Sequence, residues 1–233
     1  MDNKRREQLQ QFLYRFHLGI EGLEELNTAL IHPTYAYEHQ LPRDNQRLEF
    51  LGDAVLGLVI TTYLYQEFPD LPEGDLTRMR AAIVCEASLA KVARQINLGE
   101  LLLLGLGEEN SGGRSRSSNL ADALEAVIGS LYLVGGLKTA WDFILQVFTP
   151  ALEVLKDTSV IDSKSALQEL IQQRGPENVT YKILAEWGPD HARHYKAGVF
   201  FQNRLLATGE GHSKKEAEQE AARAALALIK IQG

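Results

Sequence analysis

Two pairs of acidic residues stand inside the most apolar stretches of this 233-residue chain. Glu49 and Asp53 are four residues apart in NQRLEFLGDAVL, and Asp122 and Glu125 are three apart in NLADALEAVIG. Both spacings place the members of a pair on one face of a helix. Like charges on a buried face repel each other, and their burial is costly unless a partner or a cation neutralises them.

Four carboxylates on two helices would form an oxygen cage of the kind that Mg²⁺ prefers. Two such ions can clamp the attacking and leaving oxygens of a phosphodiester. Structural roles stay open for single residues. Asp122 could cap a helix that begins at Asn119. Glu49 could form a surface ion pair with Arg47 or Arg78.

Other kinds of metal site fit the sequence less well. The chain has neither the E-x-x-H motif of di-iron bundles nor the H-E-x-x-H motif of zinc proteases. Its single cysteine, Cys85, excludes a thiolate zinc site and an intrachain disulfide, which suits a reducing cytoplasm. The N-terminal segment MDNKRREQLQ lacks the apolar core of a signal peptide. Glycine and aspartate interrupt the longest apolar run, so no membrane span is expected.

Two different periodicities divide the chain, and they predict an all-α domain at 1–155, a linker at 156–162 and an α+β domain at 163–233. In the first domain, apolar residues recur at helical spacing in six segments: 8–17, 23–31, 47–67, 75–96, 119–134 and 138–155. The formal charge of this part is −8, whereas residues 156–233 sum to +1. The acidity of the whole chain can therefore hide a basic binding surface in the second domain.

The second domain has the order α-β-β-β-α. SALQELIQQRG predicts a helix that closes at Gly175, and alternating apolar residues predict three short antiparallel strands, with turns at GPD and at Gln202-Asn203. The Ala-rich stretch SKKEAEQEAARAALALIK predicts the last helix, which opens with a capping box at Ser213. Lys214 and Lys215 oppose the helix dipole there, which makes sense if a phosphate binds at this N-terminus.

RLEFLGDAVL resembles the signature of the ribonuclease III family of double-stranded RNA endonucleases. ALIHPTYAYE, PEGDLTRMRA and SGGRSRSSNLADALEAVIGSLYLVGG are similar to further segments of that family, in the same order. This resemblance implies that Glu49, Asp53, Asp122 and Glu125 bind Mg²⁺, for which Mn²⁺ could substitute, and that Asp53 and Glu125 matter most for catalysis. It implies a supporting acidic role for Glu73.

One departure concerns Gln46, because many members of the family have Glu at this position. Glutamine keeps the hydrogen-bonding shape and loses the charge. The resemblance also implies a homodimer in which the signature helices pack across a two-fold axis, and Gly52 and Gly57 would permit such close packing. Ordinary packing within the chain is the alternative for both glycines.

The second domain resembles the double-stranded RNA-binding domain, a module that reads two successive minor grooves and the phosphates between them, largely by shape. The carriers of this resemblance are KSALQELIQQ, GPDHARHY and SKKEAEQEAARAAL. It implies that Lys214 and Lys215 contact phosphates and that His191 reaches one minor groove. The residues implied at the other minor groove are Ser165, Gln168, Glu169 and Gln172. Solvated polar side chains and a capping role for His191 are the structural alternatives.

The sequence therefore predicts a cytoplasmic, dimeric, Mg²⁺-dependent endoribonuclease that acts on double-stranded RNA in rRNA and mRNA processing and turnover, without a membrane or a nucleotide cofactor. Its products would carry 5′-phosphate and 3′-hydroxyl ends, and the resemblance to the ribonuclease III family implies staggered cuts with two-nucleotide 3′ overhangs. A catalytically inactive regulator that binds duplex RNA is the alternative from another class, and the intact carboxylates disfavour it. A DNA-directed nuclease is disfavoured because the module senses A-form geometry.

Overall fold

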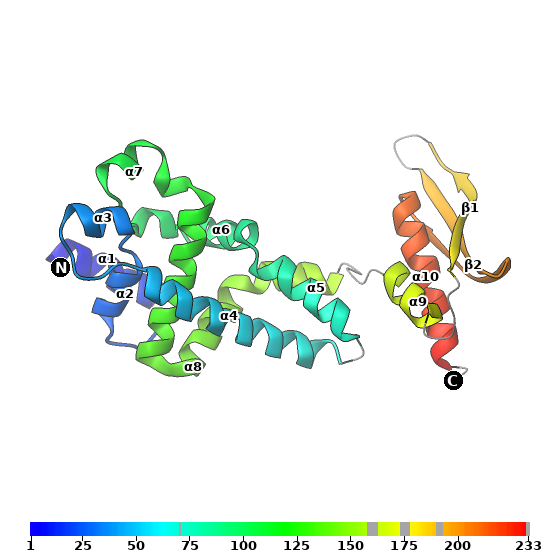
Figure 1. Cartoon of the computed structure of the whole chain (residues 1–233), viewed down its shortest axis with the longest axis horizontal. Helices are drawn as coiled ribbons and strands as arrows, with labels where there is room; N and C mark the ends of the chain where they lie inside the picture. Colours follow the sequence, from blue (N-terminus) through cyan, green and yellow to red (C-terminus); the bar gives the residue numbers. More distant parts are fainter. Residues whose placement is uncertain (70, 158–162, 173–177, 190–192, 232–233) are drawn as a thin grey trace. The chain divides into compact units, whose positions relative to one another are not determined.

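The computed structural model describes residues 1–69, 71–157, 163–172, 178–189 and 193–231. It divides into two compact units, Met1–Thr158 and Ser159–Gly233, and each is treated by itself (Figure 1). The first unit is helical, and the second combines two helices with a three-stranded sheet. The expected fold class, an all-α domain followed by an α-β-β-β-α domain, is confirmed.

Helices of different length build the first unit around one apolar core. They are α1 (Asn3–Arg15), α2 (Leu23–Ala29), α3 (Pro33–Glu38), α4 (Gln46–Glu67), α5 (Glu73–Val84), α6 (Glu86–Gln95), α7 (Leu106–Asn110) and α8 (Ser117–Asp157), with short 3₁₀ turns at Leu98–Leu101 and Gly113–Ser115. α4 and α8 lie against each other at the centre of this unit, and α2, α5 and α6 also pack on α8 (Figure 1).

Some expected helix boundaries differ from the structure, most clearly in two places. The segment expected as one helix at 75–96 is broken at Cys85, whose backbone is extended. The β-branched pair Ile83 and Val84 precedes the break and lowers the local helix propensity. The segments expected at 119–134 and 138–155 instead form one kinked helix, α8, in which Gly136 adopts a φ of 73°. Glycine tolerates this left-handed backbone without a side-chain clash.

α4 and residues 117–153 of α8 are each long and apolar enough to cross a bilayer by length and composition. We expected glycine and aspartate to make the apolar run of α4 too interrupted for a membrane span, but α4 passes this test of length and composition. Both helices instead bury apolar side chains against each other in the core of this unit, among them Val55, Leu56 and Val59 of α4 and Leu124 and Val127 of α8. A buried core helix commonly has this composition.

The second unit places two helices on an antiparallel sheet. Its elements are α9 (Ser163–Gln172), β1 (Thr180–Trp187), β2 (His194–Phe201), β3 (Arg204–Gly211) and α10 (Lys214–Ile231), and the strand order is β1-β2-β3. Gln202 and Asn203 both have positive φ and form the two-residue turn expected between β2 and β3. Leu167 and Ile171 of α9 pack with Val199 and with alanines of α10 to form a small core.

Candidate metal site and RNA-binding surface

α4 and α8 cross so closely that only glycine fits at the contact. A Cβ atom on Gly52 would lie 1.7 Å from the backbone oxygen of Glu125, and one on Gly129 would lie 2.3 Å from the backbone oxygen of Leu48. The packing of Gly52 is therefore within the chain, whereas Gly57 has no atom within 4 Å of its would-be Cβ. This backbone contact brings the acidic face of α4 beside the acidic face of α8.

Three of the four expected carboxylates meet at this crossing. Glu49, Asp122 and Glu125 each offer an oxygen, and these oxygens all lie within 4.8 Å of one another. All three side chains are partly buried. Asp53 is more exposed and is not a member of this group. It is nevertheless close enough for its charge to be the main electrostatic cause, after burial, of the raised pKa of Glu125.

The three carboxylates hold their protons more tightly than isolated acids do. Burial, followed by the charges of Asp53, Glu49 and Asp122, raises the pKa of Glu125 to about 7. Burial and the charge of Asp122 raise the pKa of Glu49. Burial raises the pKa of Asp122 as well, and the largest charge effect on it comes from Glu86. Each acid therefore raises the cost of ionising its neighbours, and a cation among them would relieve that cost.

The structural alternatives for single acids do not match the contacts within the described residues. Arg78 pairs with Asp75 on its own helix and not with Glu49. Asn119 lies inside α8 and donates its side-chain amide to Glu108 and to the backbone oxygen of Gly113, so it does not begin the helix. Among the described residues no lysine or arginine forms an ion pair with this group, although the charge of His32 acts to lower the pKa of Asp122. Such oxygen donors suit a hard divalent cation such as Mg²⁺, which the group could hold.

One nearby acid was not expected from the sequence. Glu86 is the first residue of α6, and the break at Cys85 is what places it near Asp122. The sequence could have suggested a helix break near Cys85, because the β-branched residues Ile83 and Val84 precede it. It could not show that Glu86 lies near Asp122, because that depends on where α6 packs. Glu73, expected in a supporting role, is exposed at the start of α5, accepts a hydrogen bond from Thr77 and lies outside the acidic group. Gln46 is the exposed first residue of α4.

The expected phosphate-binding residues lie at the N-terminus of α10. Ser213 accepts a hydrogen bond of 3.1 Å from the backbone N–H of Glu216, as a capping residue does. Lys214 and Lys215 are exposed in this first turn, and neither takes part in an ion pair within the part of the chain that the structure describes. The Nζ atom of Lys214 lies 5.7 Å from the centre of the Tyr195 ring.

Two residues expected at a minor groove have structural contacts as well. The amide of Gln168 donates to Asn178 and accepts from the backbone N–H of Val179. Gln172 also donates to Asn178. These bonds tie α9 to the chain that leads into β1. The side chains of Ser165 and Glu169, and the whole of His191 and of Gly175, lie outside the described residues.

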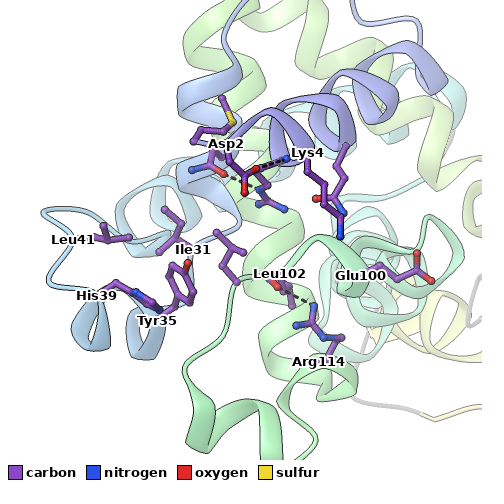
Figure 2. Close-up of a pocket in the computed structure, with 14 residues that line it drawn as sticks. Asp2, Lys4, Ile31, Tyr35, His39, Leu41, Glu100, Leu102 and Arg114 are labelled. Carbon is purple, nitrogen blue, oxygen red and sulfur yellow. Dashed lines mark hydrogen bonds between the residues drawn. The ribbon is translucent and has the colours of Figure 1, made fainter.

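A pocket in the first unit lies away from the acidic group. It has a volume of about 830 Å³, and Figure 2 shows Ile31, Tyr35 and His39 along one side, with Glu100 and Arg114 across from them. Arg114 donates to the backbone oxygens of Gly99 and Leu102, and Arg5 donates to that of Leu101. These cations hold loops together, so the pocket receives no functional assignment.

Comparisons with known proteins agree with both parts of the chain. A family model described as Ribonuclease-III-like matches residues 24–152, and one described as Double-stranded RNA binding motif matches residues 163–229. A protein named Ribonuclease 3 from Moorella thermoacetica is 74% identical over 233 residues, the full length of both chains. Another of that name from Syntrophomonas wolfei is 52% identical over 226 residues, or 97% of each chain.

Solved structures give the same result for the first unit. A structure of the nuclease domain of ribonuclease III from Campylobacter jejuni is 38% identical, has a TM-score of 0.57 and covers 65% of this chain and 97% of its own. A second structure of that domain, whose description refers to a region involved in dimer formation, is 40% identical with a TM-score of 0.56 and covers 60% and 94%. The chain therefore belongs to the ribonuclease III family of endoribonucleases, with a helical nuclease domain followed by a double-stranded RNA-binding domain.

Proposed function

We propose that this chain is a Mg²⁺-dependent enzyme that hydrolyses phosphodiester bonds in both strands of an RNA duplex, leaving 5′-phosphate and 3′-hydroxyl ends with two-nucleotide 3′ overhangs. The observation that carries the proposal is the group of three carboxylates whose oxygens lie within 4.8 Å of one another. Without a cation, the carboxylates of this group repel one another when they are ionised; with a cation, they can act as its ligands. The C-terminal match to a double-stranded RNA binding motif supports duplex RNA as the substrate.

The residues that would hold the metal are Glu49, Asp122 and Glu125, with Asp53 as the fourth acid. Mg²⁺, or Mn²⁺ in its place, would supply Lewis acidity toward the scissile phosphate and the attacking water. The protein's own part is positional: the glycine contact between α4 and α8 fixes the carboxylates before any ligand arrives. Asp53 and Glu125 are the residues whose loss should harm cleavage most, and Glu73 would support the site from outside the group.

The second unit would deliver the substrate. We assign the nuclease domain to residues 1–155, the linker to 156–162 and the RNA-binding domain to 163–233. Lys214 and Lys215 would contact phosphates, and His191 one minor groove. The other groove would be met by Ser165, Gln168, Glu169 and Gln172. Exposed lysines at a helix N-terminus support the phosphate contact, because backbone N–H groups there already favour anions.

We infer that the enzyme works as a homodimer. α4 exposes a row of residues at helical spacing, and its large members are Phe50, Leu58 and Tyr65, with 81%, 53% and 72% of their surface exposed. Leu133 and Leu137 of α8 are exposed as well. Large apolar side chains that are exposed together on one face of a helix commonly mark an interface. The described role of the Campylobacter jejuni nuclease domain in dimer formation supports a second copy as the partner.

One set of assays tests the proposal against its alternatives. The purified protein is incubated with labelled duplex RNA, duplex DNA and single-stranded RNA, each with Mg²⁺ and with a chelator. Cleavage of duplex RNA in Mg²⁺ alone is expected, with end analysis of the products and light scattering to measure mass. Tight binding without cleavage would support an inactive regulator, and equal cleavage of DNA would refute duplex RNA selectivity. We place the enzyme in the cytoplasm, in rRNA and mRNA processing and turnover.

A further inference from the structure

Three aromatic rings contact one another in series at one corner of the RNA-binding unit, the first two stacked and the last two tilted by 52°. Trp187 ends β1 and His194 begins β2, and the two are paired in the register of the sheet. Their ring centroids are 5.8 Å apart and their planes differ by 13°, which is a stacked arrangement. The His194 ring lies in turn 4.3 Å from the ring of His212, which follows β3. We call Trp187, His194 and His212 the corner stack.

The corner stack reaches the N-terminus of α10 through His212. The backbone N–H of His212 donates a hydrogen bond of 2.7 Å to the carboxylate of Glu216, in the first turn of α10. The same residue, Glu216, donates its backbone N–H to Ser213, the capping residue. The carboxylate of a capping box usually reaches the capping residue itself. Here it reaches one residue further back and fastens His212 to the helix.

The apolar side chains of the small core lie away from this corner. The buried residues of α10 begin at Ala217, after the two lysines, and the core side chains of β2, Val199 and Phe201, lie toward its far end. Close backbone packing of Gly211 on the first turn of α10 joins β3 to the helix here. Trp187 keeps 44% of its surface exposed. The corner stack therefore supplies contacts between the end of β1, the start of β2 and the first turn of α10.

Reading a duplex by shape requires contacts at fixed spacings, because minor grooves and phosphates recur at distances set by the A-form helix. In the proposed function, which this inference rests on, His191 meets a minor groove while Lys214 and Lys215 meet phosphates. We propose that Trp187, His194 and His212 are positioning residues for RNA binding, which hold the end of β1 and the start of β2 at a fixed distance from the two lysines. Planar rings suit this role because they have few rotatable bonds.

The test uses the full-length protein and a labelled RNA duplex of about 16 base pairs, the span of one such module. Binding is measured in chelator, so that no cleavage occurs, across a series of salt concentrations. His194→Ala removes the middle ring, and His194→Phe keeps a ring in its place. Leu226→Ala is the matched control, since it trims the core of the same unit about 18 Å along α10 from Lys214.

His194→Ala is expected to weaken binding about tenfold, equivalent to ~1.4 kcal/mol, with the slope of log affinity against log salt unchanged, since no phosphate contact is lost. His194→Phe is expected to bind like the wild type. Leu226→Ala should lower the unfolding temperature without changing affinity where the protein is folded. Such a pattern separates positioning from general destabilisation.

Four results would overturn the inference. Wild-type affinity in His194→Ala would show that the corner stack is irrelevant to binding. An equal loss in His194→Phe, or a smaller salt slope in His194→Ala, would show that the imidazole contacts RNA directly. A loss in Leu226→Ala as large as that in His194→Ala would show that the effect is one of folding. Failure of the wild type to bind duplex RNA would instead refute the proposed function itself.

Discussion

At the scale of single residues, Glu125 has the largest pKa shift of the acidic group. Its pKa rises from the ordinary 4.5 to about 7, because the side chain is partly buried beside other carboxylates. At pH values between 4.5 and about 7, Glu125 keeps its proton in the folded protein and has released it in the unfolded chain. Metal-free stability should therefore fall as pH rises through this window, and the raised pKa values of Glu49 and Asp122 act in the same direction.

Glu125→Gln should lower cleavage of duplex RNA by several orders of magnitude, because one ligand charge of the metal site is lost while the shape remains. Duplex RNA affinity should stay near that of the wild type, since the second domain carries most of the binding. In chelator the variant should be as stable as the wild type or more so at pH 8, and less dependent on pH between 5 and 8. Single-turnover cleavage, filter binding and unfolding at several pH values measure these effects.

Mg²⁺ provides the control for this variant. An ion that binds only the folded state stabilises it more the more tightly it binds, so Mg²⁺ should raise the unfolding temperature of the wild type more than that of Glu125→Gln. Near-normal cleavage, or marked destabilisation of the variant in chelator, would mean that Glu125 is a structural partner and not part of a metal site.

Gln46 offers a test of the one departure from the family pattern. It is exposed at the start of α4 and is outside the acidic group, so a restored charge should have little effect. Gln46→Glu should change the single-turnover cleavage rate by less than about tenfold, which corresponds to under ~1.4 kcal/mol of barrier. A much larger gain would indicate that glutamine disables the site, and would favour the inactive regulator.

The sequence predicted part of the acidic group from local spacing alone. Separations of four and three residues place Glu49 near Asp53, and Asp122 near Glu125, on their helices. Spacing within a helix does not say how two helices are rotated against each other. The offset of Asp53 from the other three acids therefore appeared only in the structure, and so did the approach of Glu86, which depends on the packing of α6 against α8.

At the scale of elements, the strands and the last helix were predictable because their patterns are local. Alternating apolar residues and a two-residue turn with positive φ specify the β2–β3 hairpin. The break between α5 and α6 was missed because an amphipathic pattern continues across Cys85. Short helices such as α3 and α7 were missed because one or two turns give too little periodicity to detect.

Gly52→Ala should separate α4 from α8, since the new methyl group would lie 1.7 Å from the backbone oxygen of Glu125. Backbone atoms at a helix crossing cannot turn away as a side chain can, so we expect destabilisation of about 2 kcal/mol or more. The acidic group should spread apart, and cleavage at a temperature where the variant is folded should fall. Chemical unfolding and single-turnover cleavage measure the two effects.

Gly57→Ala is the matched control on the same helix, because nothing lies within 4 Å of its would-be Cβ. Alanine favours a helix over glycine by up to about 1 kcal/mol, so the folded protomer should be unaffected or more stable. If both variants lost the same stability, the close contact at Gly52 would not be what holds the helices together. A loss of dimer mass in Gly57→Ala alone would place that glycine at the subunit interface.

At the scale of the whole molecule, charge is divided between the two parts of the chain. Residues 1–155 have a net charge of −8, and residues 156–233 have +1. A surface this acidic repels a polyanion at long range, so affinity for RNA must come from local cations and from shape. In the RNA-binding unit those cations include Lys214 and Lys215, whose unfavourable interaction with the helix dipole would be offset by an anion bound there.

Replacing Lys214 and Lys215 together by alanine should weaken duplex RNA binding by a similar factor for every sequence, because phosphates carry no sequence information. The slope of log affinity against log salt should shrink by about one to two, roughly one for each lost phosphate contact. Cleavage should survive at low salt, since the acidic group on α4 and α8 is intact, and fall steeply as salt rises. Filter binding over a salt series and single-turnover cleavage at both ends of it measure this. An unchanged slope would mean that the lysines face water, and lost cleavage at low salt would mean that the two domains do not divide binding and chemistry.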